Sequence, residues 1–157
     1  MIFETAEDFA AALPRAGALA GLDFGTKTIG VAVSDGLRSV ATPLETVQRK
    51  KFTLDAGRLL EIAQGRAISG FVLGLPRNMD GSEGPRAQST RAFARNLSRL
   101  TEIPIGYWDE RLSTVAAERA LLESDHSRKR RGELIDAVAA SYILQGLLDR
   151  LGYMARS

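Results

Sequence analysis

The chain has 157 residues, of which 45% are hydrophobic and 25% are charged, and its formal net charge is +2. This balance is typical of a globular protein, and the length favours a single domain over residues 1–157. The absence of cysteine excludes disulfides and thiolate metal sites. The sequence has neither a secretory signal nor an apolar run near the roughly 18 residues of a membrane span. We therefore expect a cytoplasmic protein that does not enter a membrane.

The first predicted element is a short helix over residues 4–13. Thr5 has the side chain of an N-cap, and Pro14 ends the helix because proline cannot continue it. We expect residues 1–14 to be an accessory segment of the domain.

A β-hairpin is predicted next. Two apolar runs, 18–22 and 29–33, are joined by a short turn that contains Gly25. Asp23 would lie at the mouth of this hairpin, beside backbone that glycine leaves accessible to a ligand. Asp23 could equally cap the turn, as aspartate often does.

Strands and helices alternate through the rest of the chain. Run 39–47 predicts an edge strand because it contains Pro43, and the almost wholly apolar run 68–75 predicts a strand inside a covered sheet. Alternating strands and helices favour parallel strands with helices on the faces. The predicted fold class is α/β, with a five-stranded mixed sheet flanked by helices on both faces. Its further elements are helices over 53–64, 86–100, 112–123 and 133–151, a strand over 104–108, and a polar, basic segment over 124–132.

Acidic residues follow two of the predicted strands and begin the last helix. Asp23 ends the first strand, Asp109 and Glu110 end the fifth, and Asp136 lies near the start of the helix. Because sites in α/β sheets form where loops leave the carboxyl ends of strands, these carboxylates could meet. Asp136 has a second interpretation, since a helix dipole favours a carboxylate near the N-terminus.

Three carboxylates brought together would favour a bound cation. They repel one another and raise each other's pKa, which a divalent ion relieves. Oxygen-only ligands suit Mg²⁺ or Mn²⁺. Two such ions about 4 Å apart can activate a water and stabilise the leaving oxygen of a phosphodiester.

Four segments together resemble the YqgF (RuvX) family, described as a nuclease of pre-16S ribosomal RNA and as similar to the RuvC Holliday-junction resolvase. The resemblance covers roughly residues 18–150, and the four motifs occur in the family's order. It implies a ribonuclease H-like fold and an acidic, metal-dependent site whose catalytic and metal-binding residues are Asp23, Glu110 and Asp136. The segments are 22–32, Gly74-Leu75-Pro76 with Asp80-Gly81, 109–113 and 136–140.

The assignment at the end of the fifth strand has an alternative. Successive strand residues point to opposite faces of a sheet, so Asp109 and Glu110 cannot both face Asp23. The sequence leaves open which of them does. The resemblance favours Glu110, and Asp109 stays a candidate for a supporting or capping role.

Polar and basic residues near these acids are candidates for nucleic-acid binding through backbone phosphates. Ordinary turn polarity and solvated loops are the alternative explanations. The candidates are Thr26 and Lys27 in the hairpin turn, Arg77 and Asn78 on a polar loop, and the basic cluster Arg128, Lys129, Arg130 and Arg131.

The function that the sequence favours is a metal-dependent nuclease that acts on structured RNA, in 5′-end processing of pre-16S ribosomal RNA. Resolution of branched DNA is an alternative, and so is a non-catalytic RNA-binding factor in ribosome assembly. A sugar-kinase-like phosphotransferase would need two such domains, and 157 residues supply one. The expected partners are nucleic acid and the ribosomal small subunit, bound by a monomer or homodimer.

Overall fold

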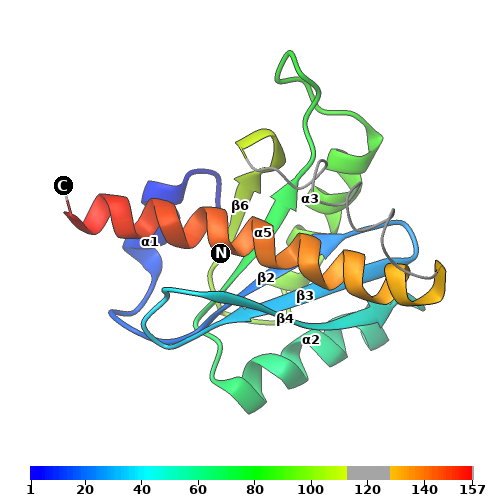
Figure 1. Ribbon diagram of the computed structural model, residues 1–157, viewed down its shortest axis with the longest axis horizontal. Helices are drawn as coiled ribbons and strands as arrows, with labels where there is room; N and C mark the ends of the chain where they lie inside the picture. Colours follow the sequence, from blue (N-terminus) through cyan, green and yellow to red (C-terminus); the bar gives the residue numbers. More distant parts are fainter. Residues whose placement is uncertain (113–127, 157) are drawn as a thin grey trace.

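The computed structural model describes residues 1–112 and 128–156, with side chains for all of these except 128–134 (Figure 1). A short 3₁₀ helix, η1, follows the last strand. The elements in chain order are β1 Ile2–Phe3, α1 Ala6–Ala12, β2 Leu19–Phe24, β3 Thr28–Ser34, β4 Ala41–Gln48, α2 Phe52–Arg66, β5 Gly70–Leu75, α3 Pro85–Ser98, β6 Ile105–Asp109, η1 Glu110–Leu112 and α5 Arg128–Arg156.

The strands form one mixed sheet in the order β1-β6-β5-β2-β3-β4. β2, β3 and β4 are joined by antiparallel pairing, whereas β5 pairs parallel with β2 and β6. The prediction of five strands was wrong, because β1 adds a sixth strand parallel to β6. Two residues are too few to show the alternating pattern by which a strand is predicted.

Helices cover both faces of the sheet, as predicted. α5 runs across one face, and Leu144 and Leu147 of this helix pack with Phe9 of α1 and Leu19 of β2 (Figure 1). The opposite face carries the larger core, to which α2 contributes Leu59 and Ile62 and α3 contributes Phe93 and Leu97.

α5 lies unusually close to β2 and β3 because glycines face it. A Cβ atom on Gly21 would lie 2.7 Å from the Leu144 Cβ and 2.9 Å from the Ala140 carbonyl oxygen. A Cβ atom on Gly30 would overlap the Asp136 carbonyl group. The missing side chains therefore let the backbone of α5 rest on the backbone of the hairpin.

Several local predictions are confirmed. The Thr5 side chain caps α1 by accepting a 3.1 Å hydrogen bond from the Asp8 amide. β4 lies at the edge of the sheet, a position at which proline is tolerated. Every residue of β5 is buried, as its apolar run predicted.

The start of α5 differs from its prediction. The helix begins at Arg128, so residues 128–132 are helical rather than part of a polar loop. Arginine, lysine and glutamate are good helix formers, and their polarity alone does not indicate a loop. The helix predicted over 112–123 lies outside the described residues except for Leu112, which ends η1. Within the described residues, no helix combines the length and the apolar character that a membrane span needs.

Candidate active site

Asp23 lies near the carboxyl end of β2, with its side chain on the face covered by α5. It is 4% exposed, and its direct cross-strand partner in β3 is Gly30. Gly21 lies two residues earlier and faces Ala140 and Leu144 of α5, so strand alternation directs Asp23 toward the same helix.

Glu110 reaches the same face from the other side of Asp23. The pairing of Leu22 with Leu73 places Gly74 of β5 beside Asp23. A Cβ atom on Gly74 would lie 2.7 Å from Glu110 Oε1 and would also meet the side chain of Ile143 in α5. The Glu110 carboxylate therefore occupies the space that a side chain at Gly74 would fill.

The backbone of Asp136 in α5 packs directly against Gly30 of β3. Its carboxylate Oδ2 accepts a 2.7 Å hydrogen bond from Thr28 Oγ1, at the start of β3. Asp136 lies eight residues after Arg128, where α5 begins. The helix-dipole interpretation therefore fails, because that effect falls off within the first turn.

The structure thus places all three predicted acids on one face of the sheet, around two glycines that flank Asp23. Glu110 lies over Gly74, and the backbone of Asp136 lies over Gly30. As the side chains stand, the described residues contain no group of three or more His, Cys, Asp or Glu that could hold a metal ion. The donor chemistry nevertheless fits a hard divalent cation, since all three groups are carboxylates.

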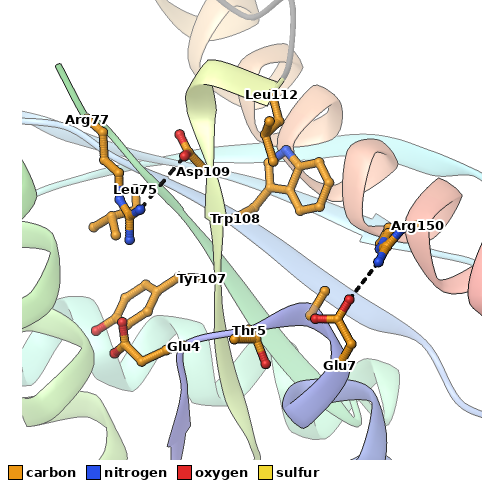
Figure 2. A pocket seen from close by; sticks show the side chains of 11 residues that line it. Glu4, Thr5, Glu7, Leu75, Arg77, Tyr107, Trp108, Asp109, Leu112 and Arg150 are labelled. Carbon is orange, nitrogen blue, oxygen red and sulfur yellow. Dashed lines mark hydrogen bonds and ion pairs between the residues drawn. The ribbon is translucent and has the colours of Figure 1, made fainter. Parts of the chain in front are cut away.

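Asp109 has a different environment from Glu110. Its carboxylate accepts hydrogen bonds from the Arg111 amide at 2.9 Å and from Arg111 Nη2 at 2.7 Å. Arg111 holds the pKa of Asp109 below its usual value. Arg77 adds a weaker ion pair at 3.9 Å, drawn in Figure 2. The Asp109 carboxylate is therefore engaged in the turn that precedes Glu110, which is consistent with a supporting role for Asp109.

A chain of ion pairs continues from this turn along the edge of the sheet. Glu83 pairs with Arg77 at 3.6 Å and with Arg91 at 2.6 Å, and Arg91 also binds Glu4 at 2.9 Å. Arg91 holds the pKa of Glu83 below its usual value. The network ties α3 and the N-terminal segment to the polar loop after β5.

A pocket of about 390 Å³ opens beside this network, between β6 and the start of α1. Figure 2 shows Glu4, Tyr107 and Asp109 on its wall, with Glu7 paired to Arg150. None of the three candidate catalytic acids lines this pocket. The cavity and the acidic site are therefore separate features.

The predicted nucleic-acid contacts in the hairpin turn are exposed. Thr26 and Lys27 both face solvent, and their backbone carbonyls accept hydrogen bonds from Arg49, through its side chain and its amide respectively. Arg49 Nη1 also donates to the Gly25 carbonyl at 2.7 Å. Thr26 and Arg49 line a pocket of about 160 Å³ with Arg86 of α3.

Arg77 and Asn78 line a third pocket, of about 290 Å³, which shares Pro85 and Arg86 with the pocket at Arg49. Asn78 is tied into its loop by a 2.9 Å hydrogen bond from Nδ2 to the Ser82 hydroxyl. Arg77 faces carboxylates at 3.6 and 3.9 Å, so part of its charge is already balanced. The basic cluster Arg128 to Arg131 forms the first turn of α5 in the backbone, and its side chains lie outside the described residues.

Comparison with known proteins tests the resemblance seen in the sequence. The family model RuvX, described as "Holliday junction resolvase", matches residues 17–150. The chain belongs to the RuvX family. The motif-based prediction is therefore confirmed over the whole of its predicted span.

Relatives of this RuvX-family chain are similar over their full length. A protein of Ruegeria sp. (strain TM1040) is 74% identical over 157 residues, which is 100% of both chains. One from Paracoccus denitrificans is 74% identical, covering 100% of this chain and 99% of its own. Both bear the name "Putative pre-16S rRNA nuclease".

A solved structure of Thermus thermophilus RuvC in complex with a Holliday junction substrate shares the fold. The TM-score is 0.50 at 16% identity, and the match covers 87% of this chain and 96% of RuvC. The predicted ribonuclease H-like fold is confirmed by this similarity, with six strands in place of five.

Sequence reasoning assigned no site role to four residues around the candidate acids, although three of them, Thr28, Gly30 and Gly74, lie in the segments that resemble the family. Thr28 holds Asp136, Gly30 and Gly74 make room for the other acids, and Arg49 secures the hairpin turn. The glycines carried a signal, since small residues within predicted strands often mark close approach of another backbone. Nothing in the sequence paired Thr28 with Asp136 or Arg49 with the turn.

Proposed function

We propose that this chain is a divalent-metal-dependent nuclease that hydrolyses phosphodiester bonds, in 5′-end processing of pre-16S ribosomal RNA. The observation that carries the proposal is the placement of Glu110 and Asp136 over the two glycines that flank Asp23. The substrate is inferred from relatives more than 70% identical that are named for it.

Asp23, Glu110 and Asp136 would hold Mg²⁺ or Mn²⁺. When bound, such ions supply positive charge that orients the scissile phosphate, favours ionisation of the attacking water and stabilises the leaving oxygen. The chain's own contribution is to hold the carboxylates in place. Thr28 orients Asp136, and the Asp109–Arg111 pair fixes the turn that carries Glu110.

The nucleic-acid contacts remain predictions from the sequence. Thr26, Arg77 and Asn78 line pockets at the carboxyl end of the sheet, which supports a role in holding phosphates, and Lys27 is exposed beside Thr26. The basic cluster over 128–131 lies on the same helix as Asp136. A cytoplasmic location, a single domain, a monomeric or homodimeric state and the ribosomal small subunit as partner are part of the same proposal.

Resolution of branched DNA is the second candidate function. The description of the matching family as a Holliday junction resolvase favours it. The deciding experiment is incubation of the purified chain with precursor 16S ribosomal RNA and with four-way DNA junctions, in Mg²⁺ or Mn²⁺ and in chelator.

Cleavage of RNA alone would support the proposal, and cleavage of junctions alone would support the second candidate. Asp23→Asn is the control for a contaminating nuclease, since it should lose cleavage by orders of magnitude. If the wild-type chain binds these substrates but cleaves none of them, the non-catalytic RNA-binding factor becomes the preferred function.

A further inference from the structure

Arg49 lies at the outer end of a row of three packed aromatic side chains, on the sheet face opposite the one that Asp23 faces. Phe52 meets Phe93 edge-on at 5.6 Å, and Phe93 stacks on Phe24 at 4.5 Å. The Arg49 guanidinium lies over the Phe24 ring at 4.3 Å. Arg49 itself is exposed.

The position of the guanidinium is fixed before any ligand binds. Arg49 Nη1 donates to the carbonyls of Gly25 and Thr26 at 2.7 and 3.1 Å, and the Arg49 amide donates to the Lys27 carbonyl at 2.9 Å. A guanidinium that stacks on an aromatic ring has a second face on which another flat group can stack. Nucleobases stack on arginine planes as they do on aromatic rings.

The pocket at this position has the charge and size for part of a nucleic-acid strand. Its described lining residues include Arg49 and Arg86 but no acidic residue, unlike the pocket lined by Glu4, Glu7 and Asp109. Arg86 forms no ion pair or side-chain hydrogen bond within the described part of the chain. The volume of about 160 Å³ lies below the roughly 300 Å³ at which drug-sized ligands begin to fit, so it suits one base.

We propose that the outer face of Arg49 stacks one unpaired nucleobase of the substrate strand, and that Arg86 holds a phosphate beside it. The subsite rests on the proposed nuclease function. Phe24 directly follows Asp23 in β2 but packs with Phe93 on the opposite face of the sheet, so the subsite and the acids lie on opposite faces at the same end of β2. A base stacked here would hold the strand at the hairpin turn, one residue along the chain from Asp23. Since every base has a flat face, the subsite selects unpaired nucleotides rather than a sequence.

The test measures binding of the full-length chain to a single-stranded RNA of roughly 12 nucleotides, a length within the site sizes of single-strand binding grooves. Ca²⁺ replaces Mg²⁺ so that binding is measured without cleavage. A 2-aminopurine base is placed at each position in turn, and an abasic RNA is made for each position. At the stacked position we expect a fluorescence change on binding, and an affinity about tenfold lower for the abasic RNA.

Arg49→Lys keeps the charge and a donor for the turn carbonyls but removes the stacking plane. It should weaken binding of the intact RNA about tenfold while leaving the affinity for the abasic RNA unchanged. Arg86→Gln should lower the slope of log K against log salt by about 0.7 and keep the fluorescence change. Arg99→Gln, at the far end of α3, is the matched control and should change neither.

Equal weakening of intact and abasic RNA by Arg49→Lys would refute stacking, since a merely structural loss lowers both affinities alike. A fluorescence change at no position would refute it as well. If the nuclease function is wrong, Mg²⁺ supports no cleavage, but Arg49→Lys still weakens binding of intact RNA more than binding of abasic RNA. If the chain cleaves RNA and Arg49→Lys weakens both equally, the subsite is wrong and the nuclease function is not.

Discussion

Thr28 Oγ1 donates a 2.7 Å hydrogen bond to Asp136 Oδ2, although 108 residues separate the two along the chain. The bond joins Thr28, the first residue of β3, to α5. Two residues further along β3, Gly30 contacts the backbone of the same Asp136. It holds the carboxylate of α5 at a defined position beside the hairpin that carries Asp23.

Removing this hydroxyl should lower activity more than stability. Thr28→Val keeps the shape of the side chain but leaves Asp136 without its donor, and residues that orient a metal ligand typically contribute 10- to 100-fold. We expect a loss of cleavage rate of about tenfold or more. Thr28→Ser should restore most of the rate. Unfolding in urea would show whether the fold is intact, and a normal rate for Thr28→Val would contradict the role.

The two glycines beside Asp23 should respond differently to alanine. In Gly30→Ala the new Cβ would overlap the Asp136 carbonyl, which belongs to the backbone and cannot rotate away. We expect a loss of about 2 kcal/mol or more in the free energy of unfolding, together with loss of cleavage. In Gly74→Ala the new Cβ would meet the ends of the Glu110 and Ile143 side chains. Cleavage should then fall with a smaller loss of stability.

Gly57→Ala is the matched control for both changes. Gly57 lies in α2, and a Cβ there would meet nothing within 4 Å. Alanine in an open helical position should raise stability by about 0.5 to 1 kcal/mol and leave cleavage unchanged. Equal effects of Gly30→Ala and Gly57→Ala on the urea midpoint would show that α5 does not rest on β3 as described.

Much of the fold could be predicted because burial leaves a periodic pattern in the sequence. The apolar run of β5 and the two apolar runs joined by the turn at Gly25 predicted strands that the structure contains. β1 could not be predicted because two residues carry no pattern. The start of α5 at Arg128 was missed for another reason, since charged residues fit a helix and a solvated loop equally well.

The site was less predictable than the fold. The motifs indicated Asp23, Glu110 and Asp136, but no pattern in one sequence reports which distant residues touch. The contact of Glu110 with Gly74 depends on how β5 and β6 pair, and the hydrogen bond from Thr28 depends on the packing of α5. Strand alternation was applied to both Asp109 and Glu110, but β6 ends at Asp109 and Glu110 begins η1.

The bidentate pair of Glu83 and Arg91 should make a small contribution to stability that depends on pH. Arg91 lowers the pKa of Glu83 below its usual 4.5, with hydrogen bonds of 2.6 and 2.8 Å. A lowered pKa stabilises the folded chain above pH 4.5, and the contribution is lost as the pH falls through the folded-state pKa. Glu83→Gln should therefore cost at most about 1 kcal/mol at pH 7 and nothing at about pH 2.

Urea midpoints at the two pH values measure this difference. The control is Glu102→Gln. It removes an exposed carboxylate that forms no ion pair within the described part of the chain. An equal loss from Glu83→Gln at both pH values would assign the effect to packing rather than charge.

Asp136→Asn should separate stability from activity. The Asn Oδ1 atom can still accept the hydrogen bond from Thr28, so the packing of α5 on β3 is kept. The change also removes one of three carboxylates from one face of the sheet, which relieves repulsion when no cation is bound. We expect an unchanged or higher melting temperature in chelator and a loss of cleavage by orders of magnitude in Mg²⁺, the trade-off typical of a functional site.

The same comparison in the presence of Mg²⁺ makes the prediction sharper. An ion held by the wild-type acids stabilises the folded chain by mass action, so the wild-type melting temperature should rise with Mg²⁺ concentration. The melting temperature of Asp136→Asn should rise less with Mg²⁺ concentration, because one of the three ligands has lost its charge. Asp149→Asn removes an exposed carboxylate from the same helix and should behave as the wild type in both measurements. If Asp136→Asn melts well below the wild type in chelator, Asp136 is a structural residue of α5 and its carboxylate is not part of a strained acidic site.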